Sequence, residues 1–167
     1  MNVVVIILTC LSFTSCAQST GKTTNTKIPP FELTVYDSDY SMAYSLQYVL
    51  TDKRLTIMFK SDLEGEKDTI LFETQLSPNK ALEHLSKIDI ASLKESYENP
   101  CISDGSQISI KLLKDNKSKI VHLSNYYHYD VGIAIEIINT LVPEKYKIWY
   151  DKEVLLKGQK DCNIGIR

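Results

Sequence analysis

The residues with the greatest capacity for chemistry in this chain of 167 residues lie between positions 101 and 130. A thiol beside an imidazole can act as a nucleophile, and thiol, imidazole and carboxylate groups together can bind a transition metal. Residues of these types here are Cys101, Asp104, His122, His128 and Asp130. Their spacing contains no Cys-x-x-Cys motif and no pair of ligands four residues apart, so we expect no catalytic residue, no metal site and no cofactor.

Carboxylates gather at two other places. Glu64, Glu66 and Asp68 flank Gly65, and acids around a glycine in a polar turn are usually a solvated loop. The segment 37–39 reads Asp-Ser-Asp but lacks the further oxygen ligands that calcium requires, so a turn is the better interpretation. A surface pair of carboxylates, or Cys101 beside a histidine, keeps a small hydrolase open as an alternative.

Charge and motifs exclude several other classes. The chain has 19 basic and 21 acidic residues, a net charge of −2, and its lysines are interspersed with acids. This distribution favours no nucleic-acid partner. The chain contains no glycine-rich phosphate loop, no Gly-x-Ser-x-Gly elbow and no His-Glu-x-x-His motif.

The first fifteen residues carry no charge, run apolar from 3 to 8, and become small and polar before Cys16. This pattern is typical of a secretory signal peptide. The segment Phe-Thr-Ser-Cys-Ala-Gln at 13–18 resembles the cleavage box of Gram-negative bacterial lipoproteins. The resemblance implies a signal peptide over 1–15, an acylated Cys16 and a lipid anchor in the cell envelope, facing the periplasm or the surface. Ordinary signal peptidase, cutting before Gln18, is the alternative.

Residues 17–30 are almost entirely polar or small, so we expect 16–30 to be the acylated cysteine and a flexible tether. The remaining 31–167 is the size of one domain. Two alternating runs joined at 115–118 predict a central β-hairpin over 106–125, with Ile108, Ile110, Leu112, Val121 and Leu123 facing the core. Further strands are expected at 31–36, 40–50, 55–59 and 68–76, although 40–50 also fits helical spacing.

Ser77 and Pro78 predict a helix start, and the helix would bury Ala81, Leu82, Leu85 and Ile88. Asp130 predicts the cap of an apolar helix over 131–142. A short helix around 91–97 and an edge strand at 146–150 complete the expected elements. The predicted fold is α+β, with an antiparallel sheet of five or six strands in one layer and two main helices on one face.

Cys101 and Cys162 are the thiols that remain if Cys10 leaves with the signal peptide and Cys16 is acylated. An envelope protein experiences an oxidising compartment, so we expect these two to form a disulfide. The alternative is two free cysteines, because the polar C-terminal segment is a poor anchor for Cys162.

Three tyrosines in four residues form the segment Tyr126, Tyr127, His128 and Tyr129. Neighbouring side chains diverge, so at least one ring should reach solvent and offer a contact surface for a protein or a sugar. The alternative is that these rings close the end of the sheet. We expect a non-enzymatic binding protein, with a carbohydrate- or peptide-binding module as another possibility. Its most concrete form, by analogy with small lipoproteins that lack catalytic motifs, is a toxin-neutralising immunity protein or inhibitor.

Overall fold

The computed structural model describes residues 28–38, 43–61, 63–89 and 92–163. The predicted signal peptide, Cys16 and most of the tether lie outside these residues. The described chain forms a seven-stranded sheet in the order β4-β3-β2-β1-β6-β7-β5. The strands are β1 (Glu32–Ser38), β2 (Tyr44–Thr51), β3 (Arg54–Ser61), β4 (Thr69–Gln75), β5 (Ser96–Glu98), β6 (Gln107–Lys114) and β7 (Lys117–Ser124).

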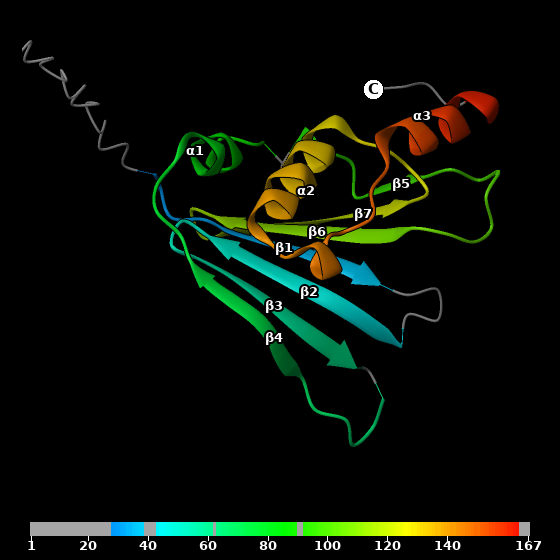
Figure 1. The fold of residues 1–167 in the computed structure, drawn as a ribbon. Coiled ribbons are helices and arrows are strands. Elements are labelled where there is room, and N and C mark those ends of the chain that lie inside the picture. Colours follow the sequence, from blue (N-terminus) through cyan, green and yellow to red (C-terminus); the bar gives the residue numbers. More distant parts are fainter. Residues whose placement is uncertain (1–27, 39–42, 62, 90–91, 164–167) are drawn as a thin grey trace, which may run out of the picture.

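Helices α1 (Lys80–Ser86), α2 (Tyr129–Leu141) and α3 (Lys152–Asp161) lie on one side of this sheet (Figure 1). The α+β class is therefore confirmed. The sheet differs from the prediction in detail, because it has seven strands and is mixed. Every pair of neighbouring strands is antiparallel except β5 and β7, which are parallel.

The central hairpin is confirmed with a shorter turn than predicted, because Lys117 and Ser118, expected in the connection, are the first residues of β7. β6 and β7 are joined by Asp115 and Asn116, whose φ angles are 51° and 59°. Two consecutive residues in the left-handed region make the turn whose twist suits a two-residue hairpin, and short polar side chains tolerate that conformation. All five apolar residues predicted to face the core are at most 8% exposed, and they lie under the helices: Ile108, Ile110, Leu112, Val121 and Leu123.

The other half of the sheet is a meander of β1 to β4. The strand interpretation of the ambiguous segment 40–50 is confirmed for its described part, because β2 pairs with β1 and β3 along its length. Tyr44 and Tyr48 are four residues apart and therefore share one face of a strand as well as of a helix, which is why the pattern was ambiguous. Thr51 closes the β2–β3 turn, since its hydroxyl oxygen accepts from the amides of Lys53 and Arg54.

The first helix begins later than predicted. Its N-cap is Asn79, whose side-chain oxygen accepts from the amide of Leu82 at 3.0 Å. Ser77 and Pro78 lie before this cap, so their assignment to the helix start is wrong by two residues. Asparagine caps a helix as well as serine does, and here its side chain reaches the free amide in the first turn. Leu82, Leu85 and Ile88 are buried as expected, while Ala81 is half-buried.

Helix α2, in contrast, begins earlier than expected. Asp130 lies in its first turn, and the N-cap residue is His128, which makes no side-chain cap bond. Its buried face includes Val131, Ala134 and Ile138. Gly132 is essential to how this helix packs. A Cβ atom at this position would overlap the ring and hydroxyl of Tyr127, so only glycine lets that ring lie against the helix.

Two of the remaining element predictions are wrong. The segment around 91–97 was expected to be helical, but its end belongs to the strand β5. The sequence did not indicate this strand, because three residues are too few to display the alternation of a strand. The edge strand expected at 146–150 is instead the end of a 3₁₀ helix, η2 (Glu144–Tyr146), followed by irregular chain. Asn139 replaces a strand neighbour there, because its amide donates to the carbonyl of Ile148 at 2.9 Å and accepts from the Ile148 amide at 2.8 Å.

The C-terminal segment, expected to be a polar tail, contains α3. The Asp151 carboxylate caps this helix by accepting from the amide of Val154 at 2.9 Å. The helix packs through a small contact, because Gly158 lies close to Asn99 and Ile102, and the side chain of Gln159 is fully buried. The Gln159 side-chain oxygen accepts from the amide of Tyr127 at 2.7 Å, which ties α3 to the segment leading into α2.

Candidate binding groove beside β7

The edge of β7 is only partly covered by its neighbour β5. β7 has eight residues, whereas β5 has three and pairs only with His122–Ser124. Among the described residues, no strand therefore pairs with the first half of β7 on this side. α1 lies over the turn end of the β6–β7 hairpin, where that open half begins (Figure 1).

Hydrogen bonds at the covered end show which residues of β7 point toward this edge. The amide of His122 donates to the carbonyl of Glu95 at 2.9 Å, and the carbonyl of Ser124 accepts from the amide of Asn99 at 3.0 Å. Successive residues of a strand direct their backbone groups to opposite sides, so Ser118 and Ile120 point the same way as His122. Within the described part of the chain, no hydrogen bond reaches the groove-side backbone groups of Ser118 or Ile120.

A hollow of about 920 Å³ lies along this unpaired edge. Its apolar lining comes from Ile88 after α1, Leu112 on β6 and Ile120 on β7. Its charged lining comprises Lys87, Lys114, Lys117, Lys119, Asp89, Glu95 and Asp115. We refer to this hollow and its lining as the β7 groove.

Lysines connect the two banks of the β7 groove. The ammonium group of Lys114 donates to the carbonyl of Ser86 at 2.6 Å, at the C-terminal end of α1. The ammonium group of Lys119 donates to the carbonyl of Leu93. Carbonyl groups at a helix C-terminus favour cations, so Lys114 stabilises α1 and also holds the hairpin at a set distance from it.

Of the predicted chemical residues, His128 and Asp130 lie together, with 4.0 Å between His128 Nδ1 and an Asp130 carboxylate oxygen, whereas Asp104 and His122 lie elsewhere. Asp104 is exposed in the loop before β6. His122 is exposed on the face of the sheet away from the helices, where its Nδ1 lies 2.8 Å from the hydroxyl of Ser109. His128 is buried at the start of α2, where burial lowers its pKa and the nearby Asp130 opposes that effect. Among the described residues, no three histidine, cysteine or acidic side chains form a metal-binding group.

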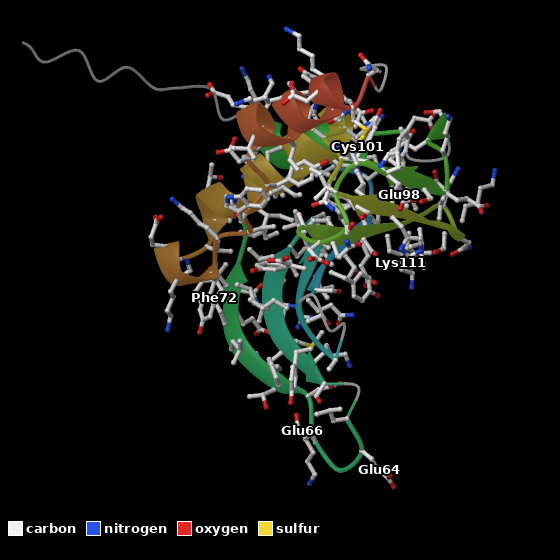
Figure 2. All side chains as sticks on the ribbon, turned by 90° about the vertical axis from the view of Figure 1, so that its right-hand side faces the viewer. Glu64, Glu66, Phe72, Glu98, Cys101 and Lys111 are labelled. Carbon is white, nitrogen blue, oxygen red and sulfur yellow. A yellow bond between two sulfur atoms is a disulfide. The ribbon has the colours of Figure 1, made fainter. Side chains whose placement is uncertain are left out.

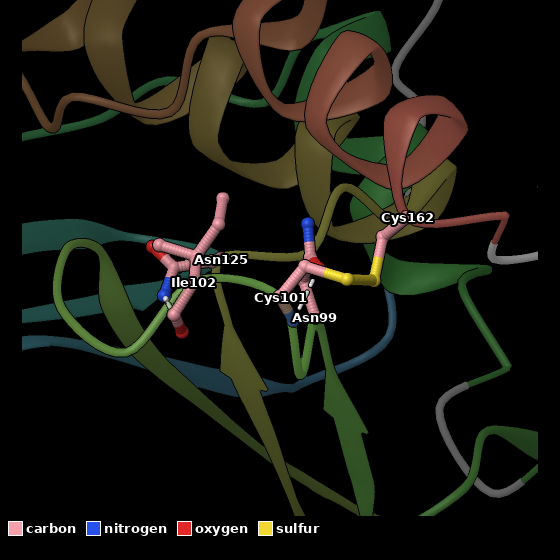
Figure 3. Close-up of a disulfide and its surroundings, with 5 residues drawn as sticks. All are labelled: Asn99, Cys101, Ile102, Asn125 and Cys162. Carbon is pink, nitrogen blue, oxygen red and sulfur yellow. Dashed lines mark hydrogen bonds between the residues drawn. A yellow bond between two sulfur atoms is a disulfide. The ribbon is translucent and has the colours of Figure 1, made fainter.

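The Cys101–Cys162 disulfide is present and confirms the prediction (Figure 3). The two Cα atoms lie 5.8 Å apart, and the residues are 61 positions apart in the chain. The side-chain oxygen of Asn99 accepts from the amide of Cys101 at 3.1 Å, which orders the loop that carries this cysteine. A cysteine in a disulfide is not a thiolate, so Cys101 has no role as a nucleophile in this state.

The tyrosine segment divides into a buried part and an exposed residue. Tyr126, Tyr127 and His128 are at most 8% exposed, whereas Tyr129 is 59% exposed. The Tyr97 ring lies 5.1 Å from that of Tyr126 and 5.0 Å from that of His128, measured between ring centres. Most of this segment therefore closes the end of the sheet, and Tyr129 is its surface residue.

Two groups of carboxylates also have defined places. Glu64 and Glu66 project from the exposed loop between β3 and β4, at the far end of the molecule from the disulfide (Figure 2). Asp37 lies at the end of β1, half-buried on the helix side, and burial raises its pKa to about 6. Asp37 also contributes to the raised pKa of Tyr48, which is mainly an effect of burial.

Comparison with protein-family models, with curated proteins and with solved structures finds no match to this chain. Among the helices of the described residues, none is long and apolar enough to span a membrane. Sequence reasoning did not identify the β7 groove. The sequence feature nearest to it is the polar segment between α1 and the hairpin. Which part of that segment forms a loop and which forms the short strand β5 depends on the neighbouring sheet, so the segment alone does not predict a groove.

Proposed function

We propose that the chain is a non-enzymatic binding protein, held at the cell envelope by lipid on Cys16, that recognises a protein partner through the β7 groove. The observation that carries this proposal is the unpaired edge of β7 beside the groove. Backbone groups without partners favour association with another chain, because pairing satisfies donors and acceptors that are otherwise left to water.

The most concrete form of this proposal is a toxin-neutralising immunity protein or an inhibitor. Proteins of these classes are frequently small lipoproteins, so the support is by analogy with the predicted anchor. The disulfide at Cys101 supports binding over the hydrolase alternative, since it occupies the thiol that a Cys-His mechanism would use.

Site-specific photo-crosslinking in the cells that produce the protein tests this proposal. A crosslinking residue at Ser118 lies in the β7 groove, one at Tyr129 lies on the exposed tyrosine, and one at Glu66 lies in a distant loop. We expect Ser118 to yield a discrete crosslinked protein and Glu66 to yield none.

A partner crosslinked from Tyr129 and not from Ser118 would transfer the binding surface to the tyrosine segment. A partner crosslinked only from Glu66 would refute the groove. If none of the three positions captures a protein, the chain is not a protein-binding module of this kind.

A further inference from the structure

The unpaired part of β7 has the geometry of an acceptor for an additional strand. Ser118 and Ile120 each direct one N–H and one C=O toward the groove, and within the described residues nothing pairs with them there. At the other end of the same edge, Glu95 and Asn99 already pair with His122 and Ser124. The short strand β5 therefore covers the end of this edge at His122–Ser124 and does not extend along the first half of β7.

The two sides of this edge differ in chemistry. Lys117 and Lys119 alternate with Ser118 and Ile120, so they lie on the helix side of the sheet, as Lys114 does opposite Lys117. On the other side, Ile120 is 42% exposed and Leu113 of β6 is 38% exposed. An added strand would consequently meet ammonium groups on one face and apolar side chains on the other.

We propose that the β7 groove binds an extended acidic segment of a protein partner as an eighth strand of the sheet. Carboxylate side chains at alternate positions of that segment would face Lys114 and Lys117, and apolar side chains between them would pack beside Ile120. This inference rests on the proposed function and specifies its partner. It belongs to the recognition mode in which backbone hydrogen bonds provide affinity and alternate side chains provide specificity.

The charges around the groove favour an acidic segment. The hairpin of β6 and β7 contributes three lysines to the lining, Lys114, Lys117 and Lys119, against one carboxylate, Asp115 in the turn. The other two carboxylates of the lining, Asp89 and Glu95, belong to the opposite bank. Complementary charge raises the rate of association and rejects partners of the wrong sign.

A second copy of the chain fits this edge less well. The other strand at the edge of the sheet, β4, reads Thr-Ile-Leu-Phe-Glu-Thr-Gln and has one carboxylate, Glu73. That carboxylate is already within reach of two groups on β3, Arg54 at 3.6 Å and the hydroxyl of Thr56 at 3.3 Å. β4 therefore lacks the alternation of acidic and apolar residues that the groove requires.

A capped, fluorescent peptide of sequence Glu-Val-Glu-Val-Glu-Val is the probe, and its binding to the full chain in detergent is measured by fluorescence anisotropy. We expect it to bind at least about tenfold more tightly than the corresponding Lys-Val peptide, and more weakly as salt is added. Two further peptides, each N-methylated at the backbone amides of one alternate set of residues, distinguish binding by backbone hydrogen bonds from binding by charge alone. Only one of the two alternate sets faces β7, so one methylated peptide should lose binding and the other should retain it.

Two pairs of protein variants complete the test. Ile120→Pro removes the groove-side N–H without breaking the pairing with β6, whereas Ile120→Thr keeps that N–H. Lys117→Glu reverses a charge in the groove, whereas Lys111→Glu reverses one on the opposite face of the same hairpin (Figure 2). We expect a loss of about tenfold or more for Lys117→Glu and little change for Lys111→Glu. Ile120→Thr loses only part of the apolar contact, so we expect Ile120→Pro to bind at least about tenfold more weakly than Ile120→Thr.

Absence of probe binding, equal binding of both methylated peptides, or equal binding by Ile120→Pro and Ile120→Thr would overturn the inference. These outcomes are separable from failure of the proposed function. If Ser118 crosslinks to a partner but the protein does not bind the peptide probe, the groove remains a binding site. Strand addition is then excluded as the way in which it binds.

Discussion

At the scale of single residues, the described chain tolerates buried polar groups mainly where they connect elements. Gln159 and Asn125 are buried, and each is bonded through a side-chain oxygen to the backbone of a different segment, at Tyr127 and Ser106 respectively. Side-chain to backbone bonds of this kind replace sheet pairing where the chain is irregular. Two other residues, Asp37 and Gly132, carry specific energetic consequences.

Asp37 should make the stability of the protein depend on pH. Burial raises its pKa from 3.8 to about 6, so between these values the folded state binds more protons than the unfolded state. The free energy of unfolding therefore falls as pH rises from about 4 to about 6. Asp37→Asn removes this penalty and should stabilise the protein by about 1–3 kcal/mol at about pH 7.5, but not near pH 4. Urea denaturation at several pH values measures the effect.

The control for this prediction is Asp104→Asn, which changes a carboxylate in an exposed loop and should alter stability little at any pH. A gain for Asp37→Asn that is the same at pH 4 and pH 7.5 would show that the carboxylate is not the cause.

Gly132→Ala should destabilise the protein although alanine favours helices. The added Cβ overlaps the Tyr127 ring, which is held between α2 and the Tyr150 ring at 5.3 Å between centres. Overpacking of this kind costs about 1–3 kcal/mol. Gly158→Ala in α3 is the matched control, since its Cβ would lie 3.3 Å from Asn99 and 3.4 Å from Ile102. Thermal melting should separate the two variants, and equal melting temperatures would contradict the account of Gly132.

At the scale of elements, α3 is the least integrated helix. Its buried residues are Leu155 and Gln159, and its far end is attached by the disulfide at Cys162. α2, by comparison, buries five residues against the sheet. The position of α3 therefore depends on a covalent link more than on apolar packing.

Reduction of the Cys101–Cys162 disulfide should lower the free energy of unfolding by about 4 kcal/mol in the chain-entropy model, because the bond closes a long loop. Hydrogen exchange in α3 should accelerate more than in α2 when the bond is reduced. A Cys101→Ser, Cys162→Ser double variant should have the stability of the reduced protein and show no response to reductant. Identical unfolding curves with and without reductant would mean that the bond contributes nothing to stability.

At the scale of the whole molecule, helices protect one face of the sheet and leave the other to solvent (Figure 1). The register places Thr34 and Thr56 on the uncovered face, yet they are only 4% and 7% exposed. Their neighbours on adjacent strands therefore cover much of that face without a second layer of helices. The arrangement leaves the edges of the sheet, and above all the β7 groove, as places where another chain can add.

Anchoring by lipid is the prediction that concerns the whole protein in its cell. Cys16→Ser should move the protein from the membrane fraction to the soluble fraction, because two or more acyl chains make attachment stable and their loss removes it. Intact mass spectrometry of the wild-type protein should show an acylated chain beginning at Cys16. An unmodified chain beginning at Gln18 would refute the lipoprotein assignment in favour of ordinary secretion.

The strongly periodic parts of the fold could be predicted from the sequence. Ile108, Ile110 and Leu112 alternate with polar residues, and the turn residues Asp115 and Asn116 suit the left-handed conformation, so the hairpin follows from local preferences. The pairing of Cys101 with Cys162 followed from counting the thiols that would remain after the predicted removal of Cys10 and acylation of Cys16. These conclusions hold because alternation, turn chemistry and cysteine number act locally or by elimination.

The tertiary structure decided what depends on neighbours distant in the chain. β5 is too short to signal itself, and it exists because β7 offers its edge. Ile148 lies in irregular chain because Asn139 satisfies its backbone. The β7 groove arises where β5 ends before β7 does, and the lengths of two strands in contact cannot be read from either strand alone. Burial of backbone polar groups requires partners, and the folded chain determines which groups receive them. The groove-side groups of Ser118 and Ile120 receive none from the residues that the structure describes.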